Sequence, residues 1–205
     1  VKAAGINEGD LVVDVCAAPG GKTMYAAMLT GSEGHVISRD LIDKKTELIE
    51  ENIERLGLSN VTVQVHDARE FDEELTGKAD VVLADLPCSG LGIMGRKNDI
   101  KYHVSMESVK ELAQLQREIL DTVCRYVKPG GTLVYSTCTI DSIENDENAV
   151  WFADTHDFSL CGIDDVVPEH GGERGFVTLH QGIDECDGFF ISKFRADSNN
   201  QIGQE

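Results

Sequence analysis

Short apolar runs alternate along the chain with longer stretches that have the spacing of an amphipathic helix. The short runs are rich in β-branched residues, which is typical of buried strands. The strands predicted in this way cover residues 11–16, 35–39, 61–66, 79–85, 132–137 and 188–194. The predicted helices cover residues 22–30, 43–58 and 142–156, together with a long helix that starts at Ser105 and stops at Pro129-Gly130-Gly131.

This order of elements predicts an α/β fold. Strands separated by helices indicate βαβ units, which give a mostly parallel sheet with helices on both faces. No linker or internal repeat divides the chain, so residues 1–195 are expected to form one domain. Residues 163–187 are acidic and glycine-rich and predict a long loop, and the polar residues 196–205 predict a disordered tail.

Thiol and carboxyl side chains stand at or just after the carboxyl ends of the predicted strands. These residues are Cys16, Asp40, Asp67, Asp85, Cys88 and Cys138. The carboxyl ends of parallel strands meet at one edge of a sheet, where open α/β folds bind their ligands, so we expect these side chains to share one site. A single cysteine at such a position is more often a small core residue, and the prediction therefore depends on the coincidence of all six.

The composition limits the kinds of partner. The 205 residues carry a net charge of −19, which on its face argues against a nucleic acid. One basic stretch, "GRKNDIKYH" at residues 95–103, follows the Cys88 segment. A short charged run is more often a solvated loop. The alternative, functional interpretation is that this segment contacts a phosphate group beside the reaction centre.

Cysteine usage and hydropathy favour a cytoplasmic protein without a metal or a membrane segment. The six cysteines are scattered and form no CxxC pair, which argues against structural zinc and against a disulfide framework. No apolar run approaches the roughly 20 residues of a membrane span.

The segment "CAAPGGKT" at residues 16–23 predicts a cofactor site. Small residues and two glycines between a strand and a helix let the backbone approach a ligand closely, but the segment matches neither common phosphate-binding pattern. Asp40 follows the second strand, where nucleoside-binding folds place a carboxylate on ribose hydroxyls, and Asp67 is expected near an adenine. An adenosine cofactor without a phosphate tail fits these features, and the cationic S-adenosylmethionine suits the carboxylates.

A thiol beside a carboxyl group suits methylation of a cytosine at carbon 5. That carbon becomes nucleophilic when a thiolate adds to carbon 6, a carboxyl group at ring N3 stabilises the adduct, and a base then removes the carbon-5 proton. Asp85 is the candidate carboxyl group, and Cys88 and Cys138 are the candidate nucleophiles. The residues alone leave the choice between the two thiols open.

Six segments carry motifs that occur together, in this order, in one known family: "DVCAAPGGKT", "DLPCSGLG", "GRKNDIKY", "ELAQLQREIL", "GGTLVYSTCTIDSIENDENAV" and "DGFFISKF". They resemble the catalytic domain of the Sun family of S-adenosylmethionine-dependent RNA cytosine-C5 methyltransferases, in particular its RsmB-like members, which modify small-subunit ribosomal RNA. The resemblance extends from about Gly9 to Phe194. It implies a Rossmann-like class I methyltransferase fold with a seven-stranded, mostly parallel sheet.

The same resemblance implies a role for each residue of the expected site. The implied cofactor-binding residues are Cys16, Ala17, Ala18, Pro19, Gly20, Gly21, Lys22, Asp40, Asp67 and Asp85. Cys138 is implied to be the nucleophile, and Cys88 is implied to assist release of the methylated base. Asp85 and Lys22 complete the implied catalytic set.

Two other functions stay open at this point. A DNA cytosine-C5 methyltransferase would use Cys88 as its nucleophile, although the order of the motifs speaks against it. A non-catalytic fragment that binds S-adenosylmethionine would account for the negative charge and for a chain that begins at Val1 without the family's N-terminal RNA-binding module. For the RNA methyltransferase, we expect that module to be basic and Arg96 and Lys97 to add local RNA contacts.

Overall fold

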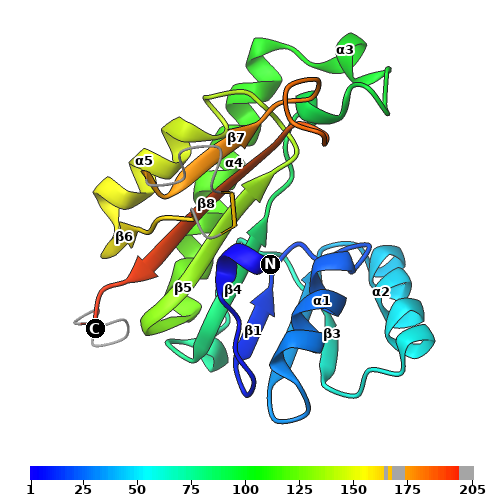
Figure 1. Ribbon diagram of the computed structural model, residues 1–205, viewed down its shortest axis with the longest axis vertical. Helices are drawn as coiled ribbons and strands as arrows, with labels where there is room; N and C mark the ends of the chain where they lie inside the picture. Colours follow the sequence, from blue (N-terminus) through cyan, green and yellow to red (C-terminus); the bar gives the residue numbers. More distant parts are fainter. Residues whose placement is uncertain (164–165, 168–173, 199–205) are drawn as a thin grey trace.

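The computed structural model describes residues 1–163, 166–167 and 174–198, and these are built around one eight-stranded sheet (Figure 1). The strands are β1 (Leu11–Asp14), β2 (His35–Asp40), β3 (Val61–Val65), β4 (Ala79–Asp85), β5 (Val127–Thr137), β6 (Phe158–Leu160), β7 (Phe176–Leu179) and β8 (Phe189–Ala196). Their order is β3-β2-β1-β4-β5-β8-β6, and β7 also pairs with β8.

The first five strands of the chain are parallel, and the last three are joined antiparallel. β2 lies between β3 and β1, and β4 lies between β1 and β5, all in parallel register. β8 pairs antiparallel with β5, β6 and β7. The predicted α/β class with a mostly parallel sheet is confirmed, but the described residues form eight strands instead of seven because β7 adds to β8.

Helices cover both faces of the sheet (Figure 1). They are α1 (Gly21–Thr30), α2 (Asp43–Leu56), α3 (Ile100–His103), α4 (Met106–Val123) and α5 (Asp146–Thr155), with short 3₁₀ helices η1 (Lys2–Ala4), η2 (Glu73–Leu75), η3 (Leu91–Ile93) and η4 (Cys124–Tyr126). Successive strand residues point to opposite faces. Val13 and Val82 therefore pack with buried side chains of α4 and α5, whereas Val12 and Val81 pack with those of α1.

Local signals in the sequence set two helix ends, whereas the predicted stop of the long helix at Pro129-Gly130-Gly131 is wrong, because α4 ends at Val123 and these three residues belong to β5. Gly57 follows α2 with φ 64°, in the left-handed region that favours glycine. Ser105 caps α4, because its side chain accepts the backbone N–H of Ser108 while the Ser108 hydroxyl accepts the backbone N–H of Ser105.

The sequence predicts neither β6 nor β7. β7 falls within residues 163–187, where the pattern predicts a loop, and it is only four residues long, while β6 has three. Strands this short contain too few positions to show an alternating pattern. Both are stabilised by pairing with β8, which is an interaction across sequence distance that a local pattern does not contain.

The end of β8 reaches the first residue of the predicted tail, at Ala196. Residues 199–205 lie outside the described residues, so their disorder stays a prediction. In the part of the chain that the structure describes, no helix combines the length and the apolar character that crossing a membrane requires.

A buried carboxyl group lies at the carboxyl end of β1. Asp14 is fully buried, and its Oδ2 accepts a hydrogen bond of 2.7 Å from the Thr23 hydroxyl. Its Oδ1 has no hydrogen-bond partner among the described residues. Burial raises the pKa of Asp14 from 3.8 to about 7, with a smaller contribution in the same direction from the charge of Asp85.

We predict that Asp14 makes the protein less stable as the pH rises from about 4 to about 7. In that window the unfolded chain releases the proton of Asp14 while the folded protein keeps it, so the free energy of unfolding falls with pH and stays low above pH 7. A difference of about three pKa units corresponds to at most roughly 4 kcal/mol. Urea unfolding at pH 5 and pH 8 will show a smaller pH-dependent loss of stability for Asp14→Asn than for the unmodified protein.

The exposed Asp154 provides the control for this measurement. Asp154→Asn will keep the pH dependence of the unmodified protein. Equal losses of stability between pH 5 and pH 8 for Asp14→Asn and Asp154→Asn would contradict the assignment.

Candidate active site

A pocket of about 400 Å³ opens at the carboxyl ends of the parallel strands. The predicted site residues that line it are Cys16, Ala18, Asp40, Asp67 and Asp85. Leu41 and Ile42 add an apolar wall that the motifs did not indicate. The volume and the mixture of apolar and charged lining are typical of a site for a small molecule.

The turn between β1 and α1 forms one wall of this pocket. Gly20 has φ 100°, and a Cβ atom at this position would lie 3.3 Å from Cγ2 of Ile49, so glycine lets the turn pack against α2. The backbone N–H of Ala18 donates to Oδ2 of Asp40 over 3.2 Å and fastens the turn to the end of β2. The remaining predicted residues of the turn are not in the pocket lining: Ala17, Pro19, Gly20, Gly21 and Lys22.

Two of the three carboxyl groups predicted to bind the cofactor, Asp40 and Asp67, are held in place at the pocket wall. Asp40 accepts the backbone N–H groups of Ala18 and Ile42, each over 3.2 Å. Asp67 is bound by Arg69, whose Nη2 lies 2.6 Å from Oδ2. Hydrogen bonds from the Arg69 side chain lower the pKa of Asp67, so this group is a carboxylate at neutral pH.

Asp85, at the end of β4, is held through both of its oxygen atoms. Lys22 Nζ lies 2.6 Å from Oδ2, and the Ser136 hydroxyl donates to Oδ1 over 2.7 Å. The Lys22 ammonium group also lies 5.4 Å from the centre of the Phe189 ring. Asp85, Lys22, Ser136 and Phe189 border a second cavity of about 280 Å³, so Asp85 lines both cavities. The sequence predicted Asp85 and Lys22 but neither Ser136 nor Phe189.

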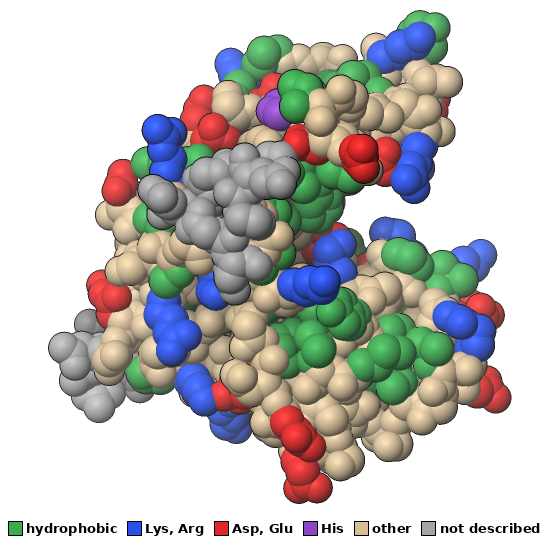
Figure 2. Space-filling model, viewed as in Figure 1, with side chains coloured by type: hydrophobic (Ala, Val, Ile, Leu, Met, Phe, Trp, Pro, Cys, Tyr) green, Lys and Arg blue, Asp and Glu red, His purple; other side chains and the backbone are tan. Residues whose placement is uncertain are grey.

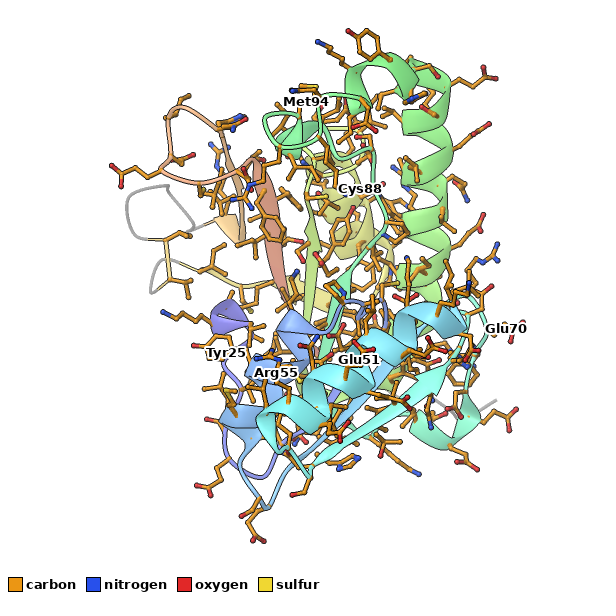
Figure 3. All side chains as sticks on the ribbon, turned by 90° about the vertical axis from the view of Figure 1, so that its right-hand side faces the viewer. Tyr25, Glu51, Arg55, Glu70, Cys88 and Met94 are labelled. Carbon is orange, nitrogen blue, oxygen red and sulfur yellow. The ribbon has the colours of Figure 1, made fainter. Side chains whose placement is uncertain are left out.

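The two candidate nucleophiles are in direct contact. Cys88 follows β4 and Cys138 follows β5, and their Sγ atoms are 3.3 Å apart with no disulfide between them. Cys88 lies on the segment between the sheet and α4 (Figure 3). The predicted juxtaposition of two strand-end thiols is therefore present, and the sulfur atoms are close enough to share one proton.

The surroundings of the two sulfur atoms favour the negative charge on Cys138. The hydrogen bond from Cys88 lowers the pKa of Cys138 from 9.0 to about 7, and Lys22 acts in the same direction against burial and Asp85. The hydrogen bond to Cys138, together with burial and the charge of Glu144, raises the pKa of Cys88. These surroundings favour a thiolate at Cys138 over one at Cys88.

Backbone contacts fix the Cys138 segment against two neighbouring loops. The N–H of Gly92 donates to the carbonyl oxygen of Cys138 over 3.0 Å, and the N–H of Gly188 donates to the Gly92 carbonyl over 2.8 Å. A Cβ atom at Gly92 would lie 2.2 Å from the Gly188 oxygen and 2.8 Å from the Cys138 oxygen. Glycine is required at this crossing, and it ties the loops after β4 and β5 to the turn before β8.

The basic segment after Cys88 lies beside a hollow of the surface, which separates the part that contains α3 from the part that contains α1 and α2 (Figures 1 and 2). Arg96, one of the two predicted RNA contacts, is paired with Asp187, with Nε 2.8 Å from Oδ2. Among the described residues, neither Lys97 nor Lys101 forms a salt bridge, and both are exposed. The unneutralised charge of the segment thus belongs to its lysines.

Metal ligands do not gather in the described part of the chain. Residues 1–163, 166–167 and 174–198 contain no group of three or more His, Cys, Asp and Glu side chains arranged to hold an ion.

Comparison with protein families places the chain among methyltransferases. The model of the family described as "16S rRNA methyltransferase RsmB/F" matches residues 3–195. Ribosomal RNA small subunit methyltransferase F of Escherichia coli O7:K1 is 35% identical over 194 residues, which covers 92% of this chain and 40% of the relative. The protein of the same name from Citrobacter koseri is 34% identical over 196 residues, with the same coverage. The chain therefore spans about 40% of the length of the curated relatives it matches.

Solved structures agree with this assignment. NSun6 from Pyrococcus horikoshii with SFG superposes with a TM-score of 0.83 at 31% identity, covering 95% of this chain and 50% of that one. A methyltransferase homolog protein from Pyrococcus horikoshii gives a TM-score of 0.81 at 29% identity, covering 95% and 64%. The predicted Rossmann-like methyltransferase fold is thus confirmed. The chain belongs to the RsmB/F family of 16S rRNA methyltransferases, whose cofactor is S-adenosylmethionine.

Proposed function

We propose that this chain is the catalytic part of an enzyme that transfers a methyl group from S-adenosylmethionine to carbon 5 of a cytosine in small-subunit ribosomal RNA. The observation that carries the proposal is the thiol–thiolate pair of Cys88 and Cys138, with sulfur atoms 3.3 Å apart. A methyl transfer to an oxygen or nitrogen atom would need no paired thiols, whereas carbon 5 of cytosine needs a thiolate to activate it.

The residues of the 400 Å³ pocket fit S-adenosylmethionine. Asp40 offers carboxylate oxygens to ribose hydroxyls, and Leu41 and Ile42 offer apolar surface to an adenine, with Asp67 beside it. Asp85 provides negative charge for the sulfonium. When bound, the cofactor supplies the electrophilic methyl group. The protein contributes the position, the negative surroundings and the exclusion of water.

We assign the reaction steps to four side chains. The Cys138 thiolate adds to carbon 6 of the cytosine, and the Lys22 ammonium group, held by Asp85, donates a hydrogen bond to the polar edge of the ring as negative charge develops there. Carbon 5 then takes the methyl group. Cys88 then gives its own proton to solvent, and the resulting thiolate accepts the carbon-5 proton, while the electron pair of that C–H bond restores the ring double bond and expels Cys138 as a thiolate.

The substrate must present its cytosine outside a stacked helix, because Cys138 lies at the edge of a packed sheet and the ring has to reach it. The chain itself is strongly acidic, so it binds RNA through local basic groups or through further parts of a longer enzyme. Lys97 and Lys101 are the local groups that we assign to phosphate contacts beside the site.

Substitution of each thiol will distinguish the nucleophilic attack by Cys138 from the release of the methylated base by Cys88. Cys138→Ser will reduce methyl transfer to unmethylated small-subunit ribosomal RNA by at least about a thousandfold, because a hydroxyl group is not ionised at neutral pH. Cys88→Ser will leave the attack intact and accumulate a covalent protein–RNA adduct, visible as a shifted band on a denaturing gel. The exposed Cys186 provides the control, and Cys186→Ser will behave as the unmodified protein. Full activity of Cys138→Ser, or an adduct trapped by that variant instead, would make Cys88 the nucleophile and overturn the assignment.

Charge reversal at the basic segment will weaken RNA binding. Lys97→Glu and Lys101→Glu, made singly, will each lower affinity for the same RNA several-fold and reduce the slope of log K against log salt concentration by about one. Lys78→Glu is the matched control, since Lys78 is exposed and precedes β4 at the opposite edge of the sheet. Binding curves at several salt concentrations provide the measurement. If the Lys97 and Lys101 variants bind as Lys78→Glu does, this segment lies outside the RNA interface.

A further inference from the structure

A buried carboxyl group lies behind the two thiols, at a position to which the motifs gave no role. Glu144 is fully buried in the turn that precedes α5. A carboxylate removed from water is costly unless donors surround it. The donors that surround Glu144 belong to the residue that follows Cys88 and to α4, which connects this group to the active site.

The first half of the arrangement holds the Cys88 segment on both sides. Ser89 donates its backbone N–H to Oε2 of Glu144 over 2.9 Å, and its hydroxyl donates to Oε1. Gln116 of α4 donates through Nε2 both to Oε2 of Glu144, over 3.0 Å, and to the carbonyl oxygen of Pro87, over 2.9 Å. Pro87 and Ser89, the residues before and after Cys88, are thus both hydrogen-bonded to the buried pair of Gln116 and Glu144.

The second half holds the Cys138 segment in the same manner, through the next residue of the chain. Asn145 is fully buried. Its Oδ1 accepts the hydroxyl of Thr137 over 2.6 Å, and its Nδ2 donates to the carbonyl oxygen of Thr139 over 3.0 Å. The residues on both sides of Cys138 are therefore attached to Asn145.

The two halves are also connected to each other. The hydroxyl oxygens of Ser89 and Thr139 are 2.8 Å apart. The Tyr135 hydroxyl of β5 lies 2.9 Å from Oε1 of Gln116 and within hydrogen-bond distance of the backbone oxygen of Glu144. A movement of either thiol segment relative to the other must therefore break buried hydrogen bonds.

We propose that Glu144 and Asn145 act as a two-residue clamp that holds Cys88 and Cys138 at the separation at which one sulfur atom can donate a hydrogen bond to the other. Glu144 acts through Ser89 and Gln116, and Asn145 acts through Thr137 and Thr139. Both are positioning residues. The catalytic role of the clamp rests on the proposed function. Its effect on the thiol pair can be measured without RNA.

Three charged groups face the sulfur atoms and affect the pKa of each thiol, and the pKa of Cys138 is the quantity that reports on the clamp. They are Lys22 from α1, Asp85 from β4 and Glu144 from the turn before α5. The hydrogen bond from Cys88 is the largest influence on Cys138 and lowers its pKa to about 7. If the clamp sets the distance between the sulfur atoms, loosening it will weaken this bond and raise the pKa of Cys138 toward 9.0, its ordinary value.

The test is the pH dependence of Cys138 alkylation by iodoacetamide in the folded chain without RNA, followed by mass spectrometry of the Cys138 peptide. The unmodified protein will show a midpoint near pH 7, and Cys88→Ala, which removes the donor, will define the shifted value. Glu144→Ala will move the midpoint upward by about one unit or more, equivalent to about tenfold slower alkylation at pH 7. Glu147→Ala, at an exposed position of α5, is the matched control and will leave the midpoint unchanged.

Glu144→Gln will keep the alkylation midpoint of Cys138 close to that of the unmodified protein if Glu144 acts by hydrogen bonding. A glutamine can turn its amide so that the oxygen accepts from Ser89 N–H and Gln116, while its NH₂ group donates to the Ser89 hydroxyl. Circular dichroism will verify that each variant is folded. If Glu144→Ala does not fold, Ser89→Ala takes its place, since it removes the hydroxyl that joins Glu144 to Thr139 and will also raise the midpoint.

A folded Glu144→Ala protein, or Ser89→Ala in its place, with an unchanged alkylation midpoint would overturn the clamp. The same measurement separates this proposal from the proposed function. Shifted midpoints in a protein that methylates no RNA would support the clamp and reject the proposed function of this chain. A protein that methylates RNA but whose variants show unshifted alkylation midpoints would support the proposed function and reject the clamp.

Discussion

The parallel pairing of β4 with β5 is the constraint on which the site depends. Their register sets Asp85 opposite Ser136, and the N–H of Leu86 donates to the Ser136 oxygen over 3.0 Å, which continues the ladder past the end of β4. The segments that leave the two strands therefore start side by side, and Cys88 and Cys138 meet a few residues later. A slip of one residue would turn every following side chain to the other face of the sheet. The chemistry at the sulfur atoms is thus built on backbone hydrogen bonds in the centre of the sheet.

Charge balance at this edge is local and differs from that of the whole chain. A net charge of −19 opposes a thiolate, and Asp85 raises the pKa of Cys138. Lys22 offsets the effect of Asp85, because its ammonium group lies 2.6 Å from that carboxylate. The largest stabilisation comes from the neutral S–H group of Cys88, which is a hydrogen-bond donor that costs no additional charge, and a backbone hydrogen bond adds to it. In an acidic protein, one thiol, one backbone hydrogen bond and one lysine thereby lower the pKa of Cys138 to about 7.

The sequence predicted the parts of this arrangement that local patterns encode. The apolar strands, the glycine turn and the strand-end thiols could all be read from composition and spacing, as could the meeting of Cys88 with Cys138. β6 and β7 could not, because each is short and is stabilised by β8 from a distance. Glu144 was equally hidden, since it stands in the acidic run "DSIENDEN", which has the composition of a solvated surface. Only the three-dimensional contacts distinguish this buried carboxylate from the half-buried Asp141 and Asp146 and from the exposed Glu147.

The choice between the two thiols illustrates what geometry adds to a family resemblance. The resemblance named Cys138 without a physical reason, and the structure provides one in the unequal surroundings of the two sulfur atoms. The difference between the surroundings of the two sulfur atoms also sets the order of the proposed reaction steps. While Cys138 carries the negative charge, its hydrogen bond is the largest cause of the raised pKa of Cys88, so Cys88 keeps its proton. Once Cys138 is bonded to the cytosine its sulfur is neutral and this cause disappears, which leaves burial and the charge of Glu144 as the causes that raise the pKa of Cys88. In the proposed reaction Cys88 therefore gives its proton to solvent only after Cys138 has attacked, and it then accepts the carbon-5 proton, so that attack precedes release.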